Sequence, residues 1–318
     1  MKKGIIIAGS ILVDKINQIE KYPKTGELVQ IKALSKAVGG CVPNNAIDIK
    51  IIDPKLNVYA SGKIGNDEEG QFVLNIFNNY NIDTNNIVVS GEKTSFTEVM
   101  SILGGERTFF TYPGASALFG ISDINFEKFN ASMLHLGYFL LLDKIDNGDG
   151  LKILKKAKES GLKTSVDLVS ENSNRYSLII PCLPYVDNLI VNEIEGAKIV
   201  GLESNANNLK DIAERLMRLG VKERVIIHMP EKGICLSQSG YTEINSFDLP
   251  KGYIKGTTGA GDAFCSGCLV GIYKEYSDRE ILEFASMCAV ASLREQDAIS
   301  GMMSEEEIKE FCKQFKRK

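Results

Sequence analysis

The stretch GTTGAGDAF, residues 256–264, places the carboxylate of Asp262 directly after three glycines and ahead of a run of apolar residues. A glycine-rich turn that leads into a helix presents outward-pointing backbone N–H groups, and such groups bind anions. We therefore predict an anion site at Gly259, Ala260 and Gly261. Asp262 has two candidate roles there. It stabilises the dipole of the helix, or it acts on the molecule to which the anion is attached.

Other polar residues and glycines follow predicted strands or begin predicted helices. In open α/β sheets ligands bind beyond the carboxyl ends of the strands, so these residues are expected to meet at one edge of a sheet. Singly, each has a structural explanation as well: Asn192 suits a helix N-cap, Glu195 a solvated helix face and Asp14 a turn. Together they predict an oxygen-rich cleft with a carboxylate in its floor. The set is Asp14, Gly39, Gly40, Asn44, Asn192, Glu195 and residues 259–262.

The elements that must position these residues alternate along the chain. Apolar runs predict strands over residues 4–13, 57–60, 133–136, 163–167, 188–191 and 224–229. Apolar residues at helical spacing predict helices over residues 43–52, 67–80, 150–160 and 206–219. This order predicts an α/β fold, a doubly wound and mostly parallel sheet with helices on both faces.

Two segments interrupt the alternation. Residues 15–36 are extended, and residues 94–112 predict a hairpin whose turn is Gly104-Gly105. We expect the two segments to form a small β-sheet lid that covers the crevice and excludes water. The α/β body then consists of residues 1–14, 37–93 and 113–318. An exposed edge of the lid could pair with a second copy, which would give a homodimer.

Composition excludes several classes of function. The 318 residues carry a formal net charge of -4 and no basic patch, so no nucleic acid partner is expected. No apolar run reaches the length of a membrane-spanning helix. Seven cysteines, an odd number spread along the chain, favour a reducing, cytoplasmic compartment over a disulfide framework. Two histidines, both in strand-like runs, give little support to a Ser-His-Asp hydrolase.

Two common nucleotide-binding motifs are missing. The glycine-rich stretch lacks the Gly-Lys-Ser/Thr of a P-loop, and the first strand ends in GSIL instead of GxGxxG. The anion site must therefore belong to another class of phosphate-binding protein.

GTTGAGDAF resembles the C-terminal signature of the ribokinase-like (PfkB) carbohydrate kinases, Asp-Thr-x-Gly-Ala-Gly-Asp. The resemblance runs nearly end to end. Gly39-Gly40 with Asn44 matches the family's N-terminal glycine pair and asparagine. Residues 63–70 match its Gly-x-Asp-x-x-Gly stretch, residues 112–115 the segment after the lid hairpin, and Asn192-Glu-Ile-Glu195 its Asn-x-x-Glu motif.

The resemblance implies an ATP-dependent kinase in which Asp262 is the general base. The N–H groups of Gly259, Ala260 and Gly261 would form the anion hole for the transferring phosphoryl group. Phosphoryl transfer requires mainly positioning and charge stabilisation, and a helix N-terminus supplies both. The implied acceptor-binding residues are Asp14, Gly39, Gly40 and Asn44, the implied ATP-side residues are Thr258, His228 and Gly233, and Asn192 with Glu195 would organise Mg²⁺ through its waters.

The expected acceptor is a hydroxyl of a small sugar. A nucleoside is the alternative, because aromatic residues in the lid could also stack on a base. A rival from another class is a nucleotide-binding regulator without turnover, against which the intact Asp262 argues. Pro230 replaces the first glycine of the family's Thr-x-Gly-x-x-Gly at residues 228–233. That change alters the loop beside the nucleotide and leaves the nucleotide preference open.

Position 256 is glycine, whereas the family usually has an aspartate there that helps to hold a monovalent cation. We therefore expect K⁺ to activate this protein only weakly. The measurement is the turnover rate with K⁺ in place of a large organic cation at equal ionic strength. A several-fold increase would contradict the expectation.

Overall fold

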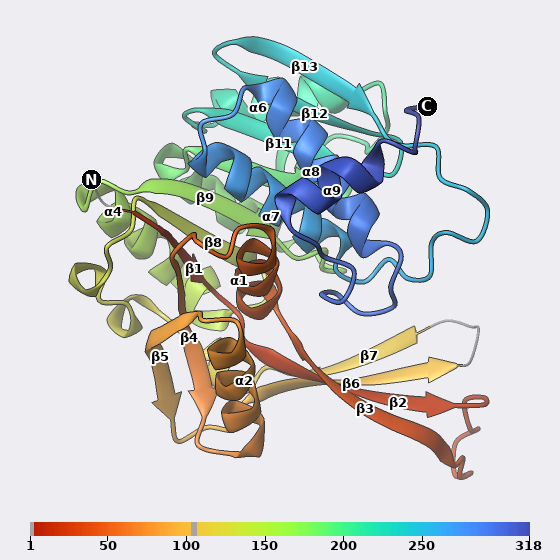
Figure 1. Ribbon diagram of the computed structural model, residues 1–318. Helices are drawn as coiled ribbons and strands as arrows, with labels where there is room; N and C mark the ends of the chain where they lie inside the picture. Colours follow the sequence, from red (N-terminus) through yellow and green to blue (C-terminus); the bar gives the residue numbers. More distant parts are fainter. Residues whose placement is uncertain (1–2, 103–106) are drawn as a thin grey trace.

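The computed structural model describes residues 3–102 and 107–318, so the expected turn at Gly104-Gly105 lies outside the described residues. Within them the chain forms a nine-stranded sheet with helices on both faces and a separate four-stranded sheet that extends from it (Figure 1). The α/β fold with a mostly parallel sheet is confirmed.

The large sheet has the strand order β13-β12-β11-β10-β9-β8-β1-β4-β5. Its strands are β1 (Ile5–Ala8), β4 (Val58–Gly65), β5 (Asp83–Ser90), β8 (Met133–Phe139), β9 (Lys163–Leu168), β10 (Asn188–Asn192), β11 (Arg224–His228), β12 (Lys232–Ser237) and β13 (Gly240–Asn245). Neighbouring strands are parallel along the part of the sheet that contains β11, β10, β9, β8, β1, β4 and β5. The hairpin of β12 and β13 is antiparallel and closes one edge.

Helices cover both faces of this sheet. They are α1 (Cys41–Ile52), α2 (Glu68–Asn79), α3 (Gly114–Ala117), α4 (Gly150–Glu159), α5 (Glu193–Val200), α6 (Leu209–Arg218), α7 (Ala260–Tyr273), α8 (Asp278–Ser292) and α9 (Glu305–Cys312). Alternate side chains of β1 point to opposite faces. Ile5 and Ile7 pack in the core under α1, α7 and α8, whereas Ile6 and Ala8 pack in the core under α4, α5 and α6. No helix in the described residues is both long and apolar enough to span a bilayer.

The small sheet has the order β3-β2-β6-β7, with β2 (Leu12–Ile19), β3 (Ile31–Gly39), β6 (Ser95–Ile102) and β7 (Arg107–Tyr112). The single strand expected over residues 4–13 is therefore wrong. The extended run ends at Gly9, whose φ of +143° suits glycine. A side chain is also excluded there, since a Cβ would lie 2.5 Å from Cys41 Sγ. The chain leaves the large sheet at Ala8 and enters the small sheet at Leu12.

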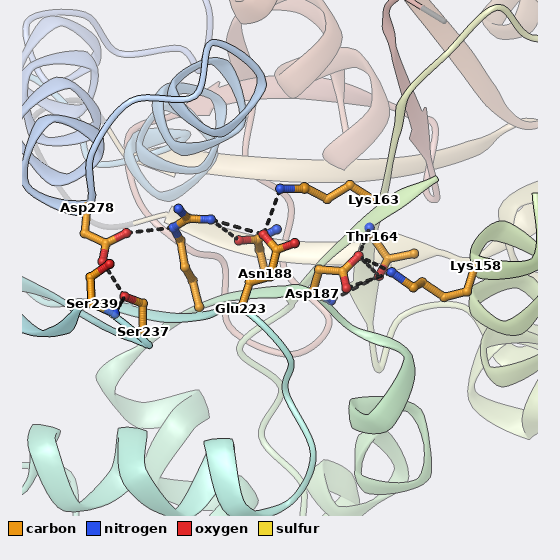
Figure 2. A network of polar contacts seen from close by, with 10 residues as sticks. Lys158, Lys163, Thr164, Asp187, Asn188, Glu223, Ser237, Ser239 and Asp278 are labelled. Atoms are coloured by element: carbon orange, nitrogen blue, oxygen red, sulfur yellow. Dashed lines mark hydrogen bonds and ion pairs between the residues drawn. The ribbon is translucent and has the colours of Figure 1, made fainter. Parts of the chain in front are cut away.

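A polar network holds the amino ends of the central parallel strands (Figure 2). Asp187, just before β10, accepts hydrogen bonds from Lys158 Nζ at 2.7 and 2.8 Å and from the Thr164 N–H at 2.8 Å. Farther along the same edge, Arg224 Nε donates to Asp278 Oδ1 at 2.7 Å. The network holds the strands at their amino ends. The carboxyl ends of the same strands are therefore free to carry a binding site.

Replacing Asp187 with alanine should lower the free energy of unfolding by about 2–3 kcal/mol, because the buried Thr164 N–H loses a charged acceptor. Urea unfolding followed by circular dichroism measures the change. Glu310→Ala is the control, since that carboxylate pairs with Lys313 on the surface, and it should change stability by less than about 0.5 kcal/mol. Equal effects of the two variants would show that the network has no special role.

Candidate active site

The carboxylate of Asp262 lies where three distant segments meet. It occupies the first turn of α7 and is only 7% exposed. Asn44, from the first turn of α1, donates its Nδ2 hydrogen to Asp262 Oδ2 at 2.8 Å. The Tyr138 hydroxyl, near the end of β8, donates to the same carboxylate at 2.9 and 3.0 Å. The predicted base and one predicted acceptor-binding residue are thus in direct contact.

Burial raises the pKa of Asp262 from 3.8 to about 7. The nearby Asp167 carboxylate raises this pKa further, while the hydrogen bonds from Asn44 and Tyr138 lower it. A carboxylate whose pKa lies near 7 exchanges a proton readily at neutral pH, which is the property that a general base needs.

The start of α7 has the geometry of an anion site. The first intrahelical bond runs from the Ala263 N–H to the Gly259 carbonyl at 2.8 Å, and the Ala260 N–H donates to the Thr257 carbonyl at 3.3 Å. The N–H groups of Gly261 and Asp262 therefore have no helical acceptor. Gly259 is the N-cap at φ +79°, and a Cβ there would lie 2.5 Å from the Cα of Ala298. Only glycine allows this loop to pack so closely while its amides turn toward an anion.

A cleft opens beside Asp262 at the carboxyl ends of the central strands. Three further predicted residues line it: Asn192, Glu195 and His228, together with Gly259, Gly261 and Asp262 itself. The cleft also contains Tyr138, Asp167 and Ser170, which the sequence did not single out. Asp167 is the last residue of an expected strand, and Tyr138 and Ser170 follow the ends of expected strands within three positions. The rule that ligands lie beyond strand ends could have found them.

Asn192 and Glu195 cap the amino end of α5. Asn192 Oδ1 accepts the Glu195 N–H at 2.8 Å, and Glu195 Oε2 accepts the Asn192 N–H at 3.0 Å. The Ser170 hydroxyl donates to Glu195 Oε1 at 2.8 Å and accepts from Asn192 Nδ2 at 2.7 Å. Burial raises the pKa of Glu195 to about 7. The pair therefore has a structural role as a helix cap and also presents a buried acidic group to the cleft.

The predicted residues Asp14 and Gly39 are not among those that line the cleft. Asp14 lies on β2 of the small sheet, where its carboxylate oxygen would be 2.7 Å from a Cβ at Gly39. Burial raises the pKa of Asp14 to about 6, although the charge of Arg107 lowers it. The same Arg107 donates from Nη1 to the Thr258 hydroxyl at 3.1 Å, just before the anion site. Arg107 thus connects the small sheet to the glycine-rich loop.

His228 and Gly233 pair across β11 and β12 at one side of the cleft. The His228 ring lies 4.8 Å from that of Phe264, and burial lowers its pKa to about 4, so it is neutral at pH 7. Gly40 precedes α1 and lies against Ser10. Neither Gly40 nor Gly233 lines the cleft itself.

Comparisons with known proteins fit this fold and cleft. The ribokinase of Arabidopsis thaliana is 24% identical over 316 residues, which cover 97% of this chain and 81% of that protein. Fructokinase-1 of Zea mays is 26% identical over 324 residues, which cover 96% of both chains. A ribokinase structure from Thermotoga maritima has a TM-score of 0.83 at 19% identity, covering 98% of this chain and 99% of that one. Arabidopsis thaliana ribokinase complexed with ribose and ATP has a TM-score of 0.82 at 22% identity, covering 98% and 99%.

The chain therefore has the ribokinase fold. The pfkB family carbohydrate kinase model matches residues 2–305, and the protein belongs to this family of carbohydrate kinases.

Replacing Gly259 with alanine should displace the loop before α7 and lower kcat by about 100-fold or more, the scale of a lost anion-hole donor. Steady-state kinetics measures the change, with circular dichroism as the test of folding. Gly201→Ala is the matched control, because Gly201 also has a positive φ, +68°, but faces open space. That variant should lose about 1 kcal/mol of stability and keep its turnover. Normal turnover in Gly259→Ala would exclude the loop as the anion site.

Proposed function

We propose that this carbohydrate kinase transfers the γ-phosphoryl group of ATP to a hydroxyl of a small sugar, with Asp262 as the general base. The observation that carries the proposal is the position of Asp262. A buried carboxylate with a pKa of about 7 stands one residue after the glycine-rich turn that begins α7. A proton acceptor and a phosphate-binding helix terminus therefore share one turn of helix.

The reaction balances with these groups. The sugar hydroxyl oxygen forms a bond to the γ-phosphorus as the bond to the ADP oxygen breaks, and the hydroxyl proton passes to Asp262. The N–H groups at the start of α7 stabilise the charge on the transferring phosphoryl oxygens. Asn44 and Tyr138 each hydrogen-bond the carboxylate, so they hold its oxygens toward the cleft in one orientation.

Mg²⁺ fits the acidic side of the cleft. Mg²⁺ prefers oxygen ligands and keeps several of its waters, and Glu195 and Asn192 offer a carboxylate and an amide there. Both side chains already bond each other and Ser170, so they would hold the ion through its waters. When bound, the ion supplies charge neutralisation for the phosphates. Glu195 also gains a positive neighbour, which offsets the burial that raises its pKa.

The fit is poor for a monovalent cation held by residue 256. A Cβ at Gly256 would lie 3.0 Å from the Cα of Gln296 and from the carbonyl oxygen of Glu295. An acidic side chain therefore has no room unless the neighbouring loop moves. This packing supports weak activation by K⁺.

On the acceptor side, the small sheet presents one face to the cleft. Asp14, Thr97 and Thr111 lie opposite one another across β2, β6 and β7. Side chains alternate along a strand, so Phe109 and Arg107 share the face of Thr111. The bond from Arg107 to Thr258 turns this face toward the anion site. We propose that residues 15–36 and 94–112 act as a lid. Phe109 of the lid and Asp14, which directly precedes the lid, would contact the sugar.

The direct test is a coupled ADP-release assay over pentoses, hexoses, 2-keto-3-deoxy sugar acids and nucleosides, with product analysis for the phosphorylated acceptor. A sugar should give stoichiometric ADP and sugar phosphate. If only nucleosides are phosphorylated, the acceptor is a nucleoside and not a sugar. ATP binding with no turnover on any acceptor would favour a non-catalytic role and overturn the proposal.

Asp262→Asn should lower kcat by about 10²- to 10⁴-fold while ATP still binds, because the amide keeps the shape and loses the basicity. The carboxylate is a cost to the folded state at high pH. Its pKa is raised from 3.8 to about 7, so the stability that it contributes falls as the pH rises through this range. The variant should therefore melt no lower than the parent at pH 8.

Asp211→Asn is the matched control for Asp262→Asn, since Asp211 also lies in the first turn of a helix, α6, but away from the cleft. It should keep its turnover. If Asp262→Asn retains most of the parental turnover, Asp262 is not the base.

Arg107→Ala should loosen the lid. We expect the acceptor KM to rise roughly 3- to 10-fold, the scale of one lost hydrogen bond. ATP hydrolysis should also increase relative to transfer, because water enters a cleft that closes poorly. Lys36→Ala is the control: Lys36 is a lid cation that packs over the Phe72 ring of α2 instead. Unchanged KM and unchanged coupling in Arg107→Ala would count against a covering role.

A further inference from the structure

A second group of reactive side chains lies beneath Asp262, outside the proposed phosphoryl-transfer machinery. His135 of β8, Asp167 of β9 and Cys265 of α7 are 0%, 7% and 2% exposed. One ligand atom from each residue lies within 4.8 Å of the other two. Cysteine sulfur, histidine nitrogen and carboxylate oxygen are the ligand atoms by which proteins bind zinc.

The separations suit a tetrahedral ion. His135 Nε2 lies 3.6 Å from Asp167 Oδ2 and 3.7 Å from Cys265 Sγ. The separation from Asp167 is longer than a normal N–H···O bond, whereas the contact with Cys265 is a weak hydrogen bond to sulfur. With Zn–N, Zn–O and Zn–S bonds of about 2.0–2.3 Å, tetrahedral ligand atoms stand about 3.4–3.6 Å apart. The two separations from His135 Nε2 already match this spacing, and all three ligand atoms lie within 4.8 Å of one another, so binding draws the set together around the ion.

The outer contacts orient the two strand residues as metal ligands require. His135 Nδ1 is 3.0 Å from the Ser165 hydroxyl. The tautomer with its proton on Nδ1 donates to that hydroxyl and leaves the Nε2 lone pair free for a metal. The Tyr138 N–H donates to Asp167 Oδ1 at 2.7 Å, which leaves Oδ2 for the ion. Asp167 and Cys265 also line the cleft, which gives an ion a route to the site.

We propose that His135 Nε2, Asp167 Oδ2 and the thiolate of Cys265 bind one Zn²⁺ at the floor of the cleft and that the bound ion inhibits the kinase. The thiol proton leaves to solvent as the Zn–S bond forms, with no change of oxidation state. The fourth position is left for water. Thiolate and imidazole select Zn²⁺ over Mg²⁺, so the site does not compete for the magnesium of the nucleotide.

Inhibition, which rests on the proposed function, follows from charge. Asp167 and Asp262 both line the cleft, and Tyr138 bonds both of them: its N–H donates to Asp167 Oδ1 at 2.7 Å and its hydroxyl to Asp262 Oδ2 at 2.9 Å. An ion bound to Asp167 replaces that negative neighbour by a positive one, and Asp262 becomes a weaker proton acceptor. Zinc should therefore lower kcat and leave the KM for ATP nearly unchanged.

The binding test uses Zn²⁺ alone on the nucleotide-free protein, in competition with a chromophoric chelator. The parent should bind one Zn²⁺ per chain at this site. Cys265→Ala should bind it more than about 100-fold more weakly, a larger loss than an outer contact causes. Two variants should bind zinc as the parent does: Cys268→Ala, a buried cysteine one turn farther along α7, and Glu195→Gln, on the other side of the cleft. Zinc affinity unchanged in Cys265→Ala would overturn the proposal.

A second readout does not depend on activity. Co²⁺ in the site should give a thiolate-to-cobalt charge-transfer band and the intense visible bands of four-coordinate cobalt, and Cys265→Ser should lose the charge-transfer band. A cobalt spectrum with no thiolate band in the parent would also overturn the site. If zinc binds the parent as proposed but the parent keeps its full rate with zinc bound, the site stands and its inhibitory role falls. If no acceptor is phosphorylated at all, the proposed function fails and the binding test still decides the site.

Discussion

The structure depends on the burial of one carboxylate. Asp262 lies at the junction of the large sheet and α1, where water is almost excluded. A buried charge is costly unless it is hydrogen-bonded. Tyr138 and Asn44 supply those bonds from segments that lie 124 and 218 residues away in the sequence. These hydrogen bonds lower the pKa of Asp262 but offset the effect of burial only in part, so the pKa is about 7 instead of the ordinary 3.8. The proposed catalytic use of Asp262 and its structural cost have the same origin.

The topology brings these donors together. β1 lies between β4 and β8 in the large sheet. After β1 the chain passes through β2 and β3 of the small sheet and returns to the large sheet as α1, close to β8 (Figure 1). The excursion that places Asn44 beside Asp262 also creates β2 and β3, on which Asp14 lies. The acceptor side and the base are therefore positioned by one crossover. The polar network around Asp187 fixes the opposite ends of the neighbouring strands (Figure 2).

Local signals predicted the parts of the site that depend on local backbone. Glycine spacing located the turn before α7, and helical periodicity located α2, α4 and α6 to within a few residues. The family resemblance placed Asn44 near Asp262. Tyr138 and Asp167 were missed because their roles arise from contacts across the sheet. Tyr138 also lies where β8 extends past the apolar run that predicted it. The division of residues 4–13 at Gly9 depends on packing against Cys41, which no local pattern records. The outer strands β5, β12 and β13 lacked the long apolar runs that marked the buried strands.

The central claim is that Asp262 is a buried base with a proton affinity matched to neutral pH. The carboxyl carbon of Asp262, assigned by comparison with Asp262→Asn in protein carrying ¹³C-labelled aspartate, can be titrated by NMR. The account predicts a midpoint near pH 7. It also predicts that kcat/KM rises with pH along a limb with the same midpoint. A midpoint near 4, or an activity limb at pH 7 that persists in Asp262→Asn, would contradict it.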